Sequence, residues 1–262
     1  MKKIFTVFIF TIFLMSMVFV VGALKPNVKD IVDSKTTNEV FIPKNAVEIS
    51  PGVFDLGKAK DKDGKIVSGL MFVHNKKESA KPDGVGGRNG GGKCYEYFAK
   101  GAKWKNTEPY VTGVGVNLTL TEMSLNTWDS EVLVNVFGTG VSGLTDGADT
   151  ISPDDKNEVM FEYLGSTGTI AYAVVWGIFY GPPSQRELIE WDVVFNNYYF
   201  DSDVMDYQNI ATHEFGHALG MAHPQDSCTE ETMYAYASPG ETKKRSLGDG
   251  DIVGIQKLYG TA

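Results

Sequence analysis

Residues 213–223 read HEFGHALGMAH, a stretch that places three histidines and a glutamate at the spacing of a metal site. On a helix, His213 and His217 lie four residues apart and share one face, so both imidazoles can reach the same ion. Gly220 permits a positive φ, with which the chain can leave the helix and bring back His223 as a third ligand. Three protein ligands leave one position open for water, as in catalytic zinc sites. The stretch therefore predicts a catalytic zinc ion bound by these histidines.

Glu214 follows the first histidine directly, where its carboxylate can hold a metal-bound water. There it would act as the general base, taking a proton from the attacking water and passing it to the departing amine. The alternative is an ordinary amphipathic helix. That alternative explains Phe215, Ala218 and Leu219 as packing residues, but it gives no reason for the spacing of the three histidines and the glutamate.

A second feature, Met233, lies ten residues after the third histidine. Together with IATHEFGHALG at 210–220 and LGDGDIVGIQKLYG at 247–260, it makes residues 93–262 resemble the catalytic domain of the matrixins. Matrixins are the matrix-metalloprotease branch of the metzincins. The resemblance implies a zinc endopeptidase that acts on protein or peptide substrates. It also implies that Met233 packs beneath the metal in a tight turn and is not a ligand.

The resemblance and the order of elements predict an α+β fold, with a mixed twisted sheet, an active-site helix and a C-terminal helix. Residues 110–116 and 132–137 read as strands, and 121–131 as the first helix. Residues 169–176 are expected to form the edge strand that lines the cleft.

The resemblance also suggests how substrate binds. An extended peptide would pair with free backbone groups at Ala171, Tyr172 and Ala173, adding a strand to the sheet edge. Tyr234 and Tyr236 would shape the pocket for the side chain after the cut, where we expect a bulky apolar residue to be preferred.

The N-terminal part is organised in three sections before the catalytic region at 93–262. Residues 1–23 read as a signal peptide, because two lysines precede a long apolar run that ends in small residues. Residues 24–80 form a β-rich segment, either a propeptide or a support for the catalytic domain. Residues 81–92 are a glycine-rich linker. Within the β-rich segment, strands are predicted at 40–42, 47–49, 53–56 and 66–73.

His74 is the only one of the four histidines outside the zinc motif. It is expected to be a surface residue at the end of a strand. A second, histidine-rich zinc site of the kind that vertebrate matrixins carry is excluded by this count. The best match is a minimal, secreted, prokaryotic-style matrixin.

Cys94 and Cys228 are the only cysteines, and in an exported chain they favour one disulfide. The alternative is a cysteine switch, in which a propeptide thiolate occupies the open zinc position. The surroundings of Cys94 do not match the Pro-Arg-Cys-Gly context of matrixin propeptides, which favours the disulfide.

The leader predicts a secreted, extracellular protein, with an uncleaved N-terminal membrane anchor as the alternative. The net charge of −9 gives no reason to expect a nucleic-acid partner. No stable partner is implied, so we expect a monomer.

Calcium is a second cofactor that the resemblance suggests, since two groups of aspartates could supply oxygen ligands. The groups are Asp201, Asp203 and Asp206, and Asp146, Asp149, Asp154 and Asp155. Solvated acidic turns are the alternative interpretation.

The other class of function is a catalytically silent, zinc-containing surface protein that binds peptides or protein partners. Glu214 favours the enzyme, because a protein that only binds has no need of a general base.

Overall fold

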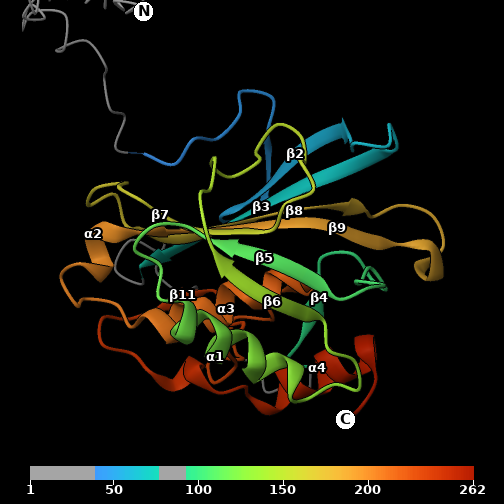
Figure 1. Cartoon of the computed structure of the whole chain (residues 1–262). Coiled ribbons are helices and arrows are strands. Elements are labelled where there is room, and N and C mark those ends of the chain that lie inside the picture. Colours follow the sequence, from blue (N-terminus) through green and yellow to red (C-terminus); the bar gives the residue numbers. More distant parts are fainter. Residues whose placement is uncertain (1–38, 77–92) are drawn as a thin grey trace, which may run out of the picture. The chain divides into compact units, whose positions relative to one another are not determined.

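The structure, a computed structural model, describes residues 39–76 and 93–262 (Figure 1). The predicted signal peptide or anchor and the predicted glycine-rich linker lie outside the described residues. The described residues fall in one compact unit, so the described N-terminal strands belong to the same unit as the metal motif. Among the described helices, none is long and apolar enough to cross a membrane.

A nine-stranded mixed sheet forms the centre of this unit. In spatial order its strands are β1 (Val47–Ser50), β2 (Val53–Lys60), β3 (Ile66–Lys76), β8 (Thr169–Ile178), β9 (Glu187–Asn196), β7 (Glu158–Glu162), β5 (Glu108–Thr112) and β6 (Phe137–Ser142). β11 (Tyr236–Ala237) pairs with β3 outside this order. The strands from β1 to β9 pair antiparallel, and those from β9 to β6 pair parallel. A separate pair joins β4 (Glu96–Tyr97) and β10 (Met221–Ala222).

Three longer helices lie on one side of the sheet in Figure 1. They are α1 (Leu118–Asp129), α3 (Tyr207–Ala218) and α4 (Asp249–Tyr259). A short helix, α2 (Asn197–Phe200), follows β9, and two 3-10 turns span Pro183–Gln185 and Lys243–Arg245. This arrangement of a mixed sheet and helices confirms the α+β prediction.

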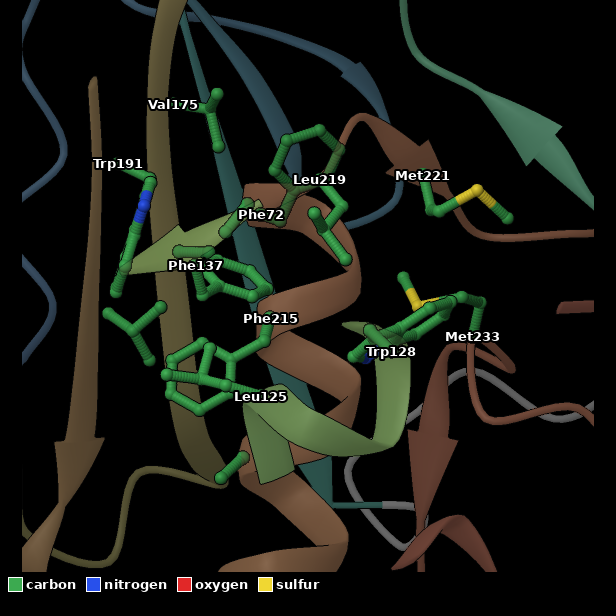
Figure 2. Close-up of a cluster of buried hydrophobic side chains, with 14 of the residues drawn as sticks. Phe72, Leu125, Trp128, Phe137, Val175, Trp191, Phe215, Leu219, Met221 and Met233 are labelled. Atoms are coloured by element: carbon green, nitrogen blue, oxygen red, sulfur yellow. The ribbon is translucent and has the colours of Figure 1, made fainter. Parts of the chain in front are cut away.

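The core between sheet and helices is built from aromatic and aliphatic side chains around α3 (Figure 2). Phe215 on α3 lies 5.6 Å, centroid to centroid, from Trp191 on β9. Trp128 on α1 donates a hydrogen bond from Nε1 to the Thr212 carbonyl at 2.7 Å. All three side chains are fully buried, so the metal-motif helix is held firmly against the sheet.

Two predictions about local elements are wrong. Residues 40–42 form no strand, and the strand expected at 132–137 begins only at Phe137. The Asp129 carboxylate accepts hydrogen bonds from the backbone N–H groups of Val136 and Phe137, which holds the preceding residues in a tight connection instead. The first helix also begins earlier than expected, at Leu118, because the Asn117 side chain caps it.

The prediction that residues 169–176 form an edge strand is also wrong. β8 lies inside the sheet, between β3 and β9, and all of its residues are buried. On one face its side chains meet α3, and on the other Trp176 donates a hydrogen bond to the Asp149 carbonyl in the loop before β7. The N-terminal strand β3 covers the edge that this strand would otherwise offer.

Candidate metal centre and active site

The helix α3 carries the metal motif and is bounded by an aspartate at its start and a glycine after its end. Asp206 caps its start, where the carboxylate accepts a hydrogen bond from the Asn209 N–H at 2.8 Å. Gly220 follows its end with a φ of 100°, which confirms the positive φ expected there. The chain then turns into β10 and returns His223 towards the helix.

The three histidines of the motif come together. Ligand atoms of His213, His217 and His223 all lie within 4.8 Å of one another. The Nε2 atoms of His217 and His223 are 3.1 Å apart. Two ligands on a tetrahedral zinc, with bonds of about 2.0–2.1 Å, would lie roughly 3.3 Å apart, so this spacing suits a shared ion.

Hydrogen bonds orient two of these rings for metal binding. His213 donates from Nδ1 to the Thr232 carbonyl at 2.6 Å, and His217 from Nδ1 to the Met221 carbonyl at 2.9 Å. With Nδ1 protonated, Nε2 of each neutral ring presents a lone pair. Burial keeps these rings neutral by lowering the pKa of His213 well below its usual value and that of His217 to about 3. The residues present therefore fit a zinc ion.

A turn beneath the histidines holds Met233, which is fully buried. Its sulfur lies so close to α3 that a Cβ added to Gly216 would come within 2.1 Å of it. Only glycine lets the helix and the methionine approach in this way. The lack of a side chain at Gly216 thus has a packing reason that the sequence motif by itself did not show.

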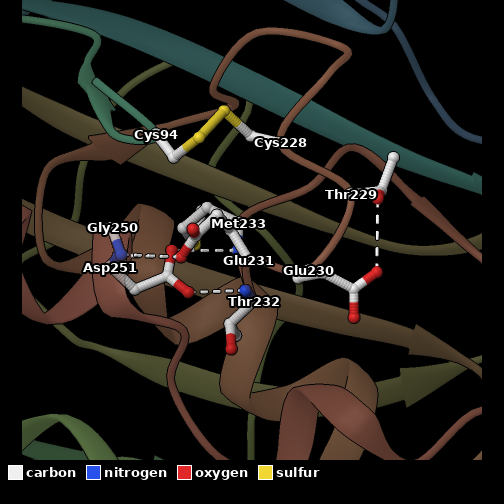
Figure 3. The surroundings of a disulfide bond; sticks show 9 residues. All are labelled: Cys94, Cys228, Thr229, Glu230, Glu231, Thr232, Met233, Gly250 and Asp251. Atoms are coloured by element: carbon white, nitrogen blue, oxygen red, sulfur yellow. Dashed lines mark hydrogen bonds between the residues drawn. A yellow bond between two sulfur atoms is a disulfide. The ribbon is translucent and has the colours of Figure 1, made fainter. Parts of the chain in front are cut away.

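Two acids that the sequence analysis missed fix this turn to α4 (Figure 3). Asp251 is fully buried and accepts hydrogen bonds from the N–H groups of Thr232, Met233 and Gly248. Glu231 accepts from the N–H groups of Gly250, at 2.9 Å, and Asp251, at 3.1 Å. Asp251 is also the third residue of α4, where a local capping pattern marks it, whereas the contacts of both acids with the turn are long-range and no local pattern predicts them.

Cys94 and Cys228 form a disulfide beside this turn, which confirms the predicted pairing (Figure 3). Their Cα atoms are 5.4 Å apart across 134 residues of sequence. Both thiols are used in this bond, so the cysteine-switch alternative is contradicted.

Glu214 is fully buried, and its environment is unusual for a carboxylate. Its Oε1 lies 2.9 Å from Nδ1 of His74, in a hydrogen bond between groups 140 residues apart. Burial raises the pKa of Glu214 well above its usual value, while the nearby Lys244 acts in the opposite direction. Lys244 is itself buried, and desolvation lowers its pKa to about 7.

The expectation that His74 is a surface residue is therefore wrong. Its side chain is only 1% exposed, and its ring centroid lies 4.1 Å from that of His213. His74 follows the apolar run Leu70–Val73, and such a continuous run is typical of a strand buried on both faces. That pattern was the available signal for its burial.

The predicted substrate-binding residues are distributed over two elements. Ala171 and Ala173 pair with β3 in the sheet, so the expectation of free backbone groups there is wrong for the described structure. The Tyr172 hydroxyl donates a hydrogen bond to Glu162 on the face away from α3. Tyr236 lines a cavity that also touches His223, whereas Tyr234 is buried.

A group of acidic side chains, separate from the histidines, lies in the loop before β7 and in the first half of β9. One ligand oxygen from each of Asp149, Asp154 and Glu190 lies within 4.8 Å of the others. Next to this group, the buried residues Glu158 on β7 and Asp192 on β9 lie opposite each other in the pairing of the two strands. Among the described residues Asp201, Asp203 and Asp206 form no such group.

Carboxylate oxygens in this set are incompletely bonded. Glu158 accepts from the Asp146 N–H, Asp192 from the Asp149 N–H, and Glu190 from the Asp155 N–H. The second oxygen of each acid has no hydrogen-bond partner among the described residues. Burial raises the pKa of Glu158 to about 7 and also raises that of Glu190.

Comparisons with known proteins show which family this chain is similar to. The family model described as matrixin matches residues 117–260, more than half of the chain. Matrix metalloproteinase-20 of Homo sapiens is 28% identical over 208 residues, covering 75% of this chain and 39% of that protein. Metalloendoproteinase 4-MMP of Arabidopsis thaliana is 42% identical over 60 residues, which are 23% of this chain and 17% of that protein. The chain thus spans well under two thirds of the length of these relatives.

Proposed function

Since this chain belongs to the matrixin family, we propose that it is a zinc-dependent endopeptidase that cleaves extended protein substrates. The observation that carries this proposal is the set of three converging histidines, two of which have Nδ1 bonded to backbone carbonyls so that Nε2 faces the other rings of the set. A zinc ion held by His213, His217 and His223 would supply Lewis-acid activation of water and of the scissile carbonyl.

Glu214 is proposed as the general base. It lies next in sequence to a metal ligand and within 4.8 Å of His213, so it can reach a water on the metal. Its carboxylate would accept the proton of the attacking water and then deliver it to the departing amine. Burial raises the pKa of Glu214 above its usual value, so this carboxylate holds a proton more readily than an exposed glutamate does.

An extended substrate could pair with Ala171, Tyr172 and Ala173 only after β3, which pairs with these residues, has left them. Tyr236 lines the cavity next to His223, and with Tyr234 it would shape the pocket for the residue after the cut. We expect a bulky apolar residue in that position.

Calcium is proposed at the acidic set of Asp149, Asp154 and Glu190. The buried, unpaired oxygens of Glu158, Glu190 and Asp192 favour a cation there over solvated turns, since a buried carboxylate is costly without a partner. Lys156 contacts Asp154 nearby and supplies only part of the compensating charge.

The leader in residues 1–23 supports a secreted protein that is cleaved before residue 24. The disulfide fits an oxidising compartment. A monomer without nucleic-acid or other stable partners remains our expectation.

The test is hydrolysis of a quenched fluorescent peptide library, with and without a zinc chelator, beside Glu214→Ala. The protein is assayed intact and after cleavage in residues 81–92. The expected result is activity that the chelator abolishes and that the variant lowers by about 10²–10⁴. Asp249→Ala, an exposed position on α4, is the matched control and should keep full activity. Zinc binding without hydrolysis in any form would instead support the peptide-binding surface protein.

A further inference from the structure

β3 lies along β8 in the position that an extended peptide would need. It pairs antiparallel with β8, so that Phe72 is opposite Ala173 and His74 is opposite Ala171. Its last two residues also pair in parallel with β11. The strand is therefore held on both sides by the two elements that our proposal assigns to substrate binding.

Two side chains of β3 reach the metal site. Phe72 and His74 are two residues apart on the strand and point to the same face, the one that α3 covers. The Phe72 ring stacks on His217 with centroids 4.1 Å apart and planes 12° apart. His74 lies against His213 and is hydrogen-bonded to Glu214 at 2.9 Å.

These contacts close the base off from solvent. Glu214, Phe72 and His74 are each at most 1% exposed. Two cavities lie next to β3. One is lined by Val73, Tyr236 and His223, and the other by Phe72, Phe98 and His223. Both reach His223, but neither is lined by Glu214.

We propose that β3 is an internal mimic of the peptide substrate and that the described chain is the latent form of the protease. This inference rests on the proposed function, because the block concerns the same cleft. β3 takes the backbone pairing of β8, Phe72 covers His217, and His74 holds the Glu214 carboxylate in place of a water. The ligand class that competes with β3 is an extended peptide with an aromatic residue, followed two positions later by a hydrogen-bonding ring.

Covalent attachment keeps this block in place. A segment on the same chain acts at an effective concentration in the millimolar range, so even a modest affinity fills the cleft. A cut between β3 and residue 93 removes this advantage, and dilution to nanomolar protein then favours release. Val67 and Met71 are fully buried on the other face of β3, so release should be slow.

The experiment uses the full chain with a site-specific protease sequence placed in residues 81–92. Hydrolysis of the peptide library is compared before the cut and after cutting, dilution and long incubation. We expect the cut form to be faster by a factor of about 10² or more. Hydrogen exchange at the amides of residues 171–175 is measured with and without zinc as a readout independent of activity, and it should increase after release.

Peptides added to the cut form test the contacts of β3. The peptide of residues 66–76 should restore inhibition and slow exchange at 171–175. Versions with His74→Ala or Phe72→Ala should inhibit at least about tenfold less well. A version with Ile66→Ala is the matched control, because Ile66 is 40% exposed at the far end of the strand, and it should inhibit as the unchanged peptide does.

The outcomes separate this inference from the function on which it rests. Equal hydrolysis by the intact and cut forms, with unchanged exchange at 171–175, would overturn the substrate mimic and leave the endopeptidase standing. Release and rebinding of the 66–76 peptide without any hydrolysis would support the occupied cleft and reject the endopeptidase. Equal inhibition by the His74→Ala and unchanged peptides would overturn the part assigned to His74.

Discussion

Two buried acidic clusters in the described part of the chain differ in how their carboxylate oxygens are bonded. Beneath the metal site, Asp251 and Glu231 accept hydrogen bonds from backbone N–H groups of the turn and of α4. At the start of β7 and β9, Glu158, Glu190 and Asp192 each keep one oxygen without a hydrogen-bond partner in the described part of the chain. A buried carboxylate is costly unless it is bonded. The first cluster is therefore complete by itself, whereas the second needs a cation or protons.

Whether the carboxylate oxygens have hydrogen-bond partners separates buried acids with a structural role from buried acids that indicate a ligand. In the first cluster the acids replace missing backbone partners, and their removal should leave N–H groups unsatisfied. Desolvation raises pKa values in both clusters, that of Asp251 to about 6, but only in the second cluster do buried carboxylate oxygens lack a hydrogen-bond partner in the described part of the chain. The two clusters should therefore respond in opposite ways to substitution and to calcium.

The largest effect is expected in the first cluster. Asp251→Ala leaves the buried N–H groups of Thr232, Met233 and Gly248 without their acceptor and should lower the free energy of unfolding by about 3–5 kcal/mol. Chemical denaturation measures this change. Asp249→Ala, exposed on the first turn of the same helix, is the control and should change stability by less than about 1 kcal/mol. Similar values for both variants would contradict the structural role of Asp251.

The disulfide beside this cluster should give the next largest effect. Replacing Cys94 and Cys228 together by alanine opens a loop of 134 residues and should lower the free energy of unfolding by about 2–4 kcal/mol. Thermal unfolding with and without reductant checks this: reductant should lower the Tm of the unchanged protein and leave that of the double variant unaffected. An unchanged Tm in the unchanged protein would argue against the pairing.

Calcium should stabilise the protein through the second cluster. At a concentration of about 100 times the Kd, a site-bound ion adds about 2.7 kcal/mol. Thermal unfolding in calcium and in chelator measures the effect. Glu190→Gln should reduce it strongly, while Glu187→Gln, at the half-buried start of the same strand, should preserve it. An equal response in both variants would place the ion elsewhere.

The calcium effect should depend on pH. The folded pKa of Glu158 is about 7, above the ordinary 4.5, so without a cation this group stabilises the fold below pH 4.5 and loses that contribution as the pH rises through 7. Calcium needs the ionised form, so the calcium-induced rise in Tm should be larger at pH 8 than at pH 6. A rise that is the same at both values would exclude Glu158 from the site.

The smallest effect is expected at the helix cap, outside both clusters. Asp206→Ala removes the acceptor of the Asn209 N–H and the partner of Arg245, and should cost about 1 kcal/mol. Denaturation of this variant gives the scale for an ordinary surface acid. A loss of unfolding free energy as large as that of Asp251→Ala would contradict the special structural role assigned to Asp251.

Local sequence was sufficient where the function depends on residues close in the chain. The spacing in residues 213–223 was enough to predict that three histidines converge, because helical periodicity places His213 and His217 on one face whatever surrounds them. The positive φ of Gly220 and the Cys94–Cys228 pairing also followed from residue type and number.

Only the tertiary structure decided which strand lies beside which. The sequence marks β3 and β8 as apolar strands, but strand pairing is a long-range choice that periodicity does not specify. As a result, β8 lies inside the sheet rather than at its edge, and His74 meets Glu214 across 140 residues. The chemistry of the site is thus encoded in one short stretch, whereas access to it depends on a distant strand, because burial and pairing are properties of the whole fold.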